Sequence, residues 1–178
     1  MGETCAELRL DAGPNTGSNG ETAQAGSKNT TDAAAATDGK GAEVYETLVH
    51  CDKTAFSMMV PDVIKAVEFL EGESKGQPLD CIVVGIETHI CVLQTSLDLL
   101  SRGHRVYVVQ DAVSSCNVEE RGVALARLRQ EGARVTTSES LIYEIMGDAK
   151  DGGFKQIAGL IKETKAETKE ALAKLCKI

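Results

Sequence analysis

The stretch that most constrains the fold runs from Leu79 to Arg102 and reads LDCIVVGIETHICVLQTSLDLLSR. Up to Ile86 it is a β-branched apolar run without polar alternation, which is typical of a strand buried on both faces of a parallel sheet. Past a break at Gly85, isoleucine and leucine recur at spacings of three and four, and this predicts an amphipathic helix ending before Gly103. The stretch therefore predicts a strand, a turn and a helix.

Cys91 falls within the first turn of this predicted helix. A thiol in that position faces unpaired backbone N–H groups and the positive end of the helix dipole, and both favour the thiolate. A free cysteine is more commonly a small core residue. The position is nevertheless the one in which a cysteine nucleophile would be found.

The remainder of the chain alternates between strand and helix patterns. Strands are expected at Tyr45–His50, at Arg105–Val109 (closing at Asp111) and at Arg134–Thr136. Helices are expected from Pro61 to about Gly72, at Glu139–Met146 and through Phe154–Ile161. A further helix is expected after a cap at Asn117, with Glu120 at its third position and with Val118, Leu125 and Leu128 on its inner face. This order predicts right-handed βαβ units and a mostly parallel sheet, hence an α/β fold.

The first 44 residues differ from the rest in composition. From Ala12 to Glu43 there is no Leu, Ile, Val, Phe or Met, so this part has too little apolar surface to offset the entropy of ordering it. Residues 1–44 are therefore predicted to be a disordered or atypical segment, with one short strand at Cys5–Leu10. The ordered domain is expected at residues 45–164, followed by a solvated helical tail at 165–178.

The charge and hydropathy patterns exclude several classes of partner. The net charge of −8 carries no basic cluster, which argues against binding to nucleic acid or anionic membranes. No apolar run approaches the ~20 residues that a membrane span needs, and no hydrophobic signal region begins the chain. A cytoplasmic protein is expected.

The six cysteines are widely spaced and form no CxxC pair. A chain with this much aliphatic core needs no disulfide scaffold, so the thiols are predicted to be reduced. No group of His and Cys has the spacing of a zinc site, so we expect neither a metal nor another cofactor.

Four motifs in order resemble the isochorismatase-like cysteine hydrolases, in particular the eukaryotic isochorismatase domain-containing branch. The resemblance covers roughly Tyr45 to Lys162, and the motifs are Lys53-Thr-Ala-Phe-Ser57, Gly85-Ile-Glu-Thr-His-Ile-Cys91, Asp111-Ala-Val-Ser-Ser115 and Thr136-Thr-Ser-Glu139. It implies a three-layer, Rossmann-like α/β fold and an Asp–Lys–Cys triad.

The family's functional residues map onto two of these motifs. The nucleophile falls on Cys91 and the lysine on Lys53, although most lysines are simply solvated. The family's non-proline cis peptide maps to Ile86–Glu87, and the substrate-binding turn to Ile86, Glu87 and Thr88. The oxyanion hole would be formed by the backbone N–H groups of Glu87 and Cys91.

The chain departs from the family before Lys53. The strand that carries the catalytic aspartate should precede Lys53, but the apolar-poor segment stands there, so the N-terminal strands are expected to be missing or replaced. Asp11 is the only candidate acid in a strand-like setting, and it lies too close to Lys53 to leave room for the missing helix and strand. The Asp/His metal ligands of nicotinamidase relatives are also absent. A truncated or alternatively spliced product would explain this departure, and it would leave one edge of the strand at residues 81–86 unpaired.

Two functions follow from these patterns. The first is an isochorismatase-family hydrolase acting on a small-molecule amide or related C–N bond, with the vinyl-ether hydrolysis of isochorismate as a variant. The second is a catalytically inactive binding or interaction protein that keeps the fold. We expect His89 to be satisfied or exposed rather than a general base, Asp111 to have a strand-end role, and the chain to form a homo-oligomer.

Overall fold

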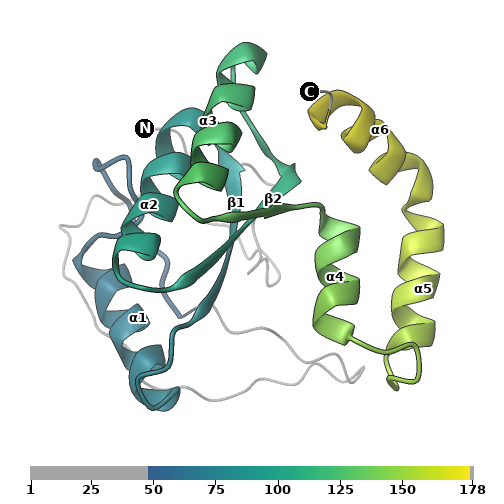
Figure 1. Cartoon of the computed structure of the whole chain (residues 1–178), viewed down its shortest axis with the longest axis horizontal. Helices are drawn as coiled ribbons and strands as arrows, with labels where there is room; N and C mark the ends of the chain where they lie inside the picture. Colours follow the sequence, from purple (N-terminus) through teal and green to yellow (C-terminus); the bar gives the residue numbers. More distant parts are fainter. Residues whose placement is uncertain (1–47, 177–178) are drawn as a thin grey trace, which may run out of the picture. The chain divides into compact units, whose positions relative to one another are not determined.

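The structure is a computed structural model that describes residues 48–176 (Figure 1). The predicted strand Cys5–Leu10 and the candidate acid Asp11 lie outside the described residues. The elements, in chain order, are α1 Pro61–Glu73, β1 Asp80–Ile86, the π-helical turn η2 Thr88–Val92, α2 Leu93–Ser101, β2 Arg105–Ser114, α3 Val118–Gln130, β3 Arg134–Thr136, α4 Ser138–Met146, α5 Phe154–Glu163 and α6 Lys165–Leu175.

The three described strands form one parallel sheet in the order β1-β2-β3. Asp80 of β1 pairs with Arg105 of β2, and Tyr107 of β2 pairs with Arg134 of β3. Each strand is followed by a helix, because parallel neighbours need a crossover connection. The predicted α/β fold with a parallel sheet is confirmed.

The hydrophobic core is built around β2. Val106, Val108 and Val113 of this strand are almost fully buried, and they pack in one cluster with Leu125 and Leu128 of α3. Helices α2, α3, α4 and α6 all contact β2, so its side chains are covered from both faces. Full burial of one such apolar side chain adds about 1.5–3 kcal/mol to the stability of the folded state.

Strand β1 differs from its prediction. Ile82, Val84 and Ile86 are 51%, 57% and 71% exposed, whereas only the alternate residues such as Cys81 and Val83 turn toward the core. The prediction of burial on both faces is therefore wrong within the part of the chain that the structure describes. The reason is that no described helix covers the outer face of β1, and an apolar run cannot bury itself without a second layer.

A cleft of about 290 Å³ lies beside β1, with side chains of α1 and α2 among its walls. Its lining includes Val63 and Val67 of α1, Thr95 and Leu99 of α2, and Met58. Helix α1 begins at Pro61, as predicted, but none of its residues is buried. The region around β1 is thus packed more loosely than the region around β2.

Two boundaries in the middle of the chain also differ. Strand β2 continues past Asp111 to Ser114 instead of closing there. Asn117 does precede α3, but its side chain makes no capping hydrogen bond, and Val118 is exposed rather than on the inner face. Residues 48–50, the described part of the predicted first strand, form no strand.

The C-terminal segment forms two helices instead of one. Helix α5 covers the predicted Phe154–Ile161 segment, and α6 covers most of the expected solvated tail. Neither helix has a fully buried residue, but α6 contacts β2 and the carbonyl of Leu175 accepts a hydrogen bond from Arg121. The tail is thus attached to the sheet at its end.

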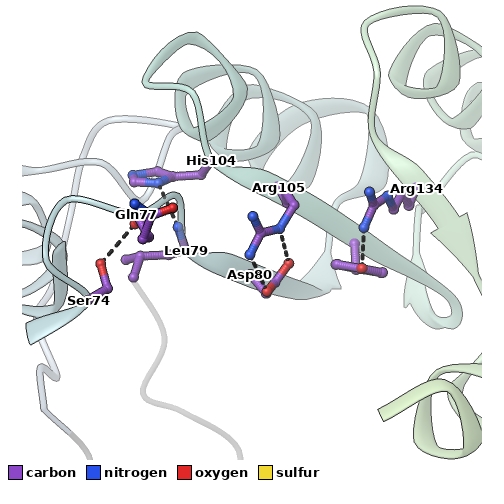
Figure 2. A network of polar contacts seen from close by, with 8 residues as sticks. Ser74, Gln77, Leu79, Asp80, His104, Arg105 and Arg134 are labelled. Carbon is purple, nitrogen blue, oxygen red and sulfur yellow. Dashed lines mark hydrogen bonds and ion pairs between the residues drawn. The ribbon is translucent and has the colours of Figure 1, made fainter. Parts of the chain in front are cut away.

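Polar contacts fix the amino ends of the strands (Figure 2). Arg105 donates two hydrogen bonds of 2.6 Å to the carboxylate of Asp80, and the Leu79 N–H donates to Nδ1 of His104 at 3.4 Å. The buried His104 also lies with Nε2 3.3 Å from the carboxylate of Glu71 in α1. These contacts lie at the end of the sheet that is opposite to the turn after β1.

No helix among the described residues is long and apolar enough to cross a bilayer.

Candidate functional site

The candidate site begins at the carboxyl end of β1, where the strand gives way to the turn η2. Gly85 has φ +139°, a conformation that L side chains rarely adopt, so glycine is required at this break. The next peptide bond, Ile86–Glu87, is cis, as the family resemblance implies. Helical structure then starts at Thr88 as a π turn, earlier than the predicted helix, and Cys91 lies within this turn.

Cys91 and Lys53 are brought together although they are 38 residues apart in the chain. The Nζ atom of Lys53 lies 4.0 Å from the Sγ atom of Cys91, and both residues are half-buried. The same ammonium donates to the backbone carbonyls of Ala55 at 2.8 Å and Phe56 at 2.9 Å, which fixes its direction. The pair predicted from the motifs is therefore assembled in space.

The segment that carries Lys53 is attached to α2 by a contact that the sequence did not reveal. The N–H of Met58 donates to Oγ1 of Thr95 at 2.9 Å, and Thr95 is buried. This hydrogen bond ties the loop before α1 to the helix that follows Cys91. A threonine on the face of a helix carries no pattern that would single it out beforehand.

Thr88 and Glu87 hold the turn against the end of β2. Thr88 is fully buried, and its hydroxyl donates to the carbonyl of Ser114 at 2.9 Å. The carboxylate of Glu87 accepts from the N–H of Cys116 at 2.9 Å, and this hydrogen bond is the main reason why the pKa of Glu87 lies below its usual value. Glu87 therefore binds the neighbouring loop as a carboxylate.

His89 interacts with the same loop. Its Nδ1 atom lies 3.1 Å from the hydroxyl of Ser115 and 3.6 Å from the carboxylate of Glu87. The Nδ1 atom thus has hydrogen-bonding neighbours, which agrees with the expectation of a satisfied ring. The contacts of residues 87, 88 and 89 with residues 114–116 explain why the turn after β1 and the end of β2 are held as one unit.

Asp111 has a structural role next to the site. Its carboxylate accepts from the N–H and the hydroxyl of Ser138, at 2.8 and 2.6 Å, at the first residue of α4. Thr137 adds a side-chain cap at the same helix start. Asp111 lies inside β2 rather than at its end, so the expected strand-end position is wrong, but these contacts give the side chain a structural role at the start of α4.

No carboxylate within residues 48–176 forms an ion pair or hydrogen bond with Lys53 or Cys91. The described part of the chain also contains no group of three or more His, Cys, Asp or Glu side chains that could hold a metal ion. Ile86 ends β1, and Glu87, Thr88 and Cys91 lie in the turn that follows. The roles proposed for these residues in substrate and oxyanion binding stay predictions.

The described cysteines are all free thiols, including Cys51 and Cys116. Burial raises the pKa of the Cys81 and Cys176 thiols, with a further contribution from nearby carboxylates. These two thiols are therefore less prone to ionise than an exposed cysteine.

Comparison with known proteins decides the family. The chain matches the family described as "Isochorismatase domain" over residues 16–140, which is most of its length. The chain belongs to the isochorismatase family. The family that the motifs predicted is thereby confirmed.

Two curated relatives illustrate the similarity. The chain is 47% identical over 112 residues to the "Secreted isochorismatase effector Isc1" of Phytophthora sojae, a match that covers 63% of this chain and 51% of that protein. It is 50% identical over 111 residues to the isochorismatase domain-containing protein 2A of Mus musculus, covering 62% and 51%. The chain thus spans about half the length of the curated relatives it matches.

A solved structure supports the fold. The structure described as a MAR1 ribonuclease from Caenorhabditis elegans has a TM-score of 0.52 and 42% sequence identity with this chain, and the match covers 62% of this chain and 53% of that one. The isochorismatase-like α/β fold expected from the motifs is therefore confirmed.

Proposed function

We propose that this isochorismatase-family chain is a hydrolase that cleaves an amide or related C–N bond of a small molecule, with Cys91 as its nucleophile. The observation that carries the proposal is the 4.0 Å distance between Lys53 Nζ and Cys91 Sγ at the carboxyl end of β1. An ammonium group beside a thiol favours the thiolate, which is the reactive form.

The reaction would proceed in two steps. The Cys91 thiolate attacks the carbonyl carbon of the amide, and the backbone N–H groups of Glu87 and Cys91 stabilise the negative oxygen that forms. The C–N bond then breaks, and the amine leaves after taking up a proton. Water attacks the resulting thioester, which releases the carboxylic acid and regenerates the thiol. The alternative reaction within this family's chemistry is hydrolysis of the vinyl ether of isochorismate.

A second candidate function is a catalytically inactive protein that binds a partner or small molecule. One observation favours it: within residues 48–176, the Lys53–Cys91 pair has no carboxylate partner, so the acid of the family triad is not supplied there. The candidate acid Asp11 lies outside the described residues. In this case Cys91 would behave as an ordinary thiol and no turnover would be found.

The test is alkylation of each cysteine by iodoacetamide as a function of pH, with each site followed by mass spectrometry. For the hydrolase, Cys91 should react at lower pH than Cys51 and Cys116, and Lys53→Met should abolish this difference. Lys65→Met is the matched control because Lys65 is an exposed lysine on α1. Equal reactivity of Cys91, Cys51 and Cys116 in the folded protein would contradict the hydrolase and favour the binding protein.

Substrates would then be sought among small amides, with Cys91→Ser as the inactive control. An RNA substrate belongs in the same panel because the solved relative is described as a ribonuclease, although the net charge of −8 disfavours it. The cytoplasmic location and the homo-oligomer stay predictions from the sequence, and one relative is described as a secreted effector.

A further inference from the structure

Arg121 of α3 is a buried cation held by backbone carbonyls. It is 5% exposed, and its guanidinium donates to the carbonyl of Val113 at 2.9 Å and to those of Gln110 and Leu175. Burial holds the pKa of Arg121 below its usual value, with Asp111 and Cys176 acting in the opposite direction. A planar guanidinium has five donors, so it can bind three carbonyls at once.

The two carbonyls on β2 lie at an irregularity in the sheet. Residues 107–109 of β2 pair with β3, whereas Val113 and Ser114 pair with Gly85 and Ile86 of β1. The register between β1 and β2 shifts between these two regions. Arg121 therefore binds one carbonyl within the irregular stretch, that of Gln110, and one at its end, that of Val113, which directly precedes Ser114.

Ser114 connects this stretch to the candidate site, because its carbonyl accepts the hydrogen bond from the buried Thr88 hydroxyl. Thr88 begins the π turn that contains Cys91. On its other side, Arg121 binds the carbonyl at the end of α6, the last helix drawn in yellow in Figure 1. The contacts thus run from Leu175 through Arg121 and the end of β2 to the turn of Cys91.

We propose that Arg121 is a positioning residue that couples the C-terminal helix α6 to the turn carrying Cys91. Its catalytic consequence rests on the function proposed above, whereas the structural coupling does not. Arg121 acts through the carbonyls of β2. When the end of α6 is displaced, the irregular stretch and then the Thr88–Ser114 contact lose order.

The experiment uses hydrogen exchange, followed by mass spectrometry, on the full-length chain. Arg121→Lys keeps the charge but loses the planar guanidinium that donates to three carbonyls. Arg127→Lys is its control, because Arg127 lies on the exposed side of α3. Ala173→Pro disrupts the last turn of α6, whereas Lys165→Pro places proline at the first helical position, where it is tolerated.

The expected result is local. Arg121→Lys and Ala173→Pro should each raise exchange about tenfold in residues 110–116 and 87–92, the scale of one lost hydrogen bond to a charged group. In these two variants, exchange in α1 should stay as in the unchanged chain. In both control variants, exchange should stay unchanged in all segments. If Ala173→Pro leaves residues 110–116 unaltered, or if exchange rises equally in all segments, the coupling is overturned.

Alkylation of Cys91 in the same samples separates this inference from the proposed function. Slower or pH-shifted alkylation in Arg121→Lys, with unchanged rates at Cys51, supports positioning of the nucleophile. If Cys91 of the unchanged chain reacts like the other thiols, the proposed function fails, while the exchange data still decide whether α6 and the turn are coupled.

Discussion

Strands β1 and β2 are neighbours that both carry several β-branched apolar residues, yet their environments differ sharply. Val108 of β2 has no exposed surface, whereas Val84 of β1 is 57% exposed. Four helices contact β2, while the outer face of β1 has no helix over it in the part of the chain that the structure describes. Burial is decided by the layers that other segments provide, because an apolar strand supplies only one surface of each contact.

The largest effect is expected from a charge placed at one valine of each strand. Val108→Asp should lower the free energy of unfolding by several kcal/mol, because an unpaired carboxylate would be buried. Val84→Asp should cost about 1 kcal/mol, the scale of strand propensity. Urea unfolding followed by circular dichroism measures both, and equal losses would show that the two strands are buried alike.

A smaller change sharpens the same comparison. Val108→Thr preserves shape but buries a hydroxyl, so it should cost about 1–3 kcal/mol of unfolding free energy. Val84→Thr exposes its hydroxyl to water and should stay within about 0.5 kcal/mol of the unchanged chain. The difference in urea midpoint between the two variants is the measurement, and a larger loss at Val84 would contradict this picture.

The outer face of β1 should also affect association more than stability. Within the described residues β1 is an edge strand, and exposed apolar side chains on an edge strand promote contact between chains. A triple variant, Ile82→Thr, Val84→Thr and Ile86→Thr, should shift the molar mass measured by light scattering toward the monomer at high concentration, with little change in Tm. An unchanged mass distribution would show that this face takes no part in association.

The smallest effect concerns the ion pair at the amino ends of β1 and β2. The hydrogen bonds from Arg105 hold the pKa of Asp80 below its ordinary value of 3.8, so the pair stabilises the fold above that pH. This stabilisation is lost as the pH falls through the lowered pKa. Asp80→Asn should therefore reduce Tm slightly at neutral pH and not at the acid end of a Tm-against-pH series. The effect is small because both side chains of the pair are exposed to solvent. A difference in Tm between Asp80→Asn and the unchanged chain that persists at low pH would contradict the role of the pair.

Local patterns predicted much of the order of elements. Pro61 marked the start of α1 and Gly103 the end of the helix after Cys91, because each residue has a backbone preference that acts within one turn. The motifs at Lys53 and Cys91 identified two residues that lie 4.0 Å apart. These features depend on neighbours in sequence or on spacing that a family preserves.

Other features depended on contacts between distant segments. The extension of β2 beyond Asp111 accompanies the hydrogen bonds from Arg121, which approaches from α3, and the helix pattern gave no sign that this arginine is buried. The missing side-chain cap at Asn117 likewise shows that a favourable residue type does not ensure the contact.

The sequence by itself determined the class of fold, the break at Gly85 and the cysteine that follows it, because periodicity and backbone preference act locally. Only the tertiary structure decided that β1 has an exposed face, that the loop after Lys53 is held by Thr95 of α2, and that α6 is tied to β2 through Arg121. The physical reason is that burial and hydrogen bonding need two partners, and the second partner is chosen by how the segments pack.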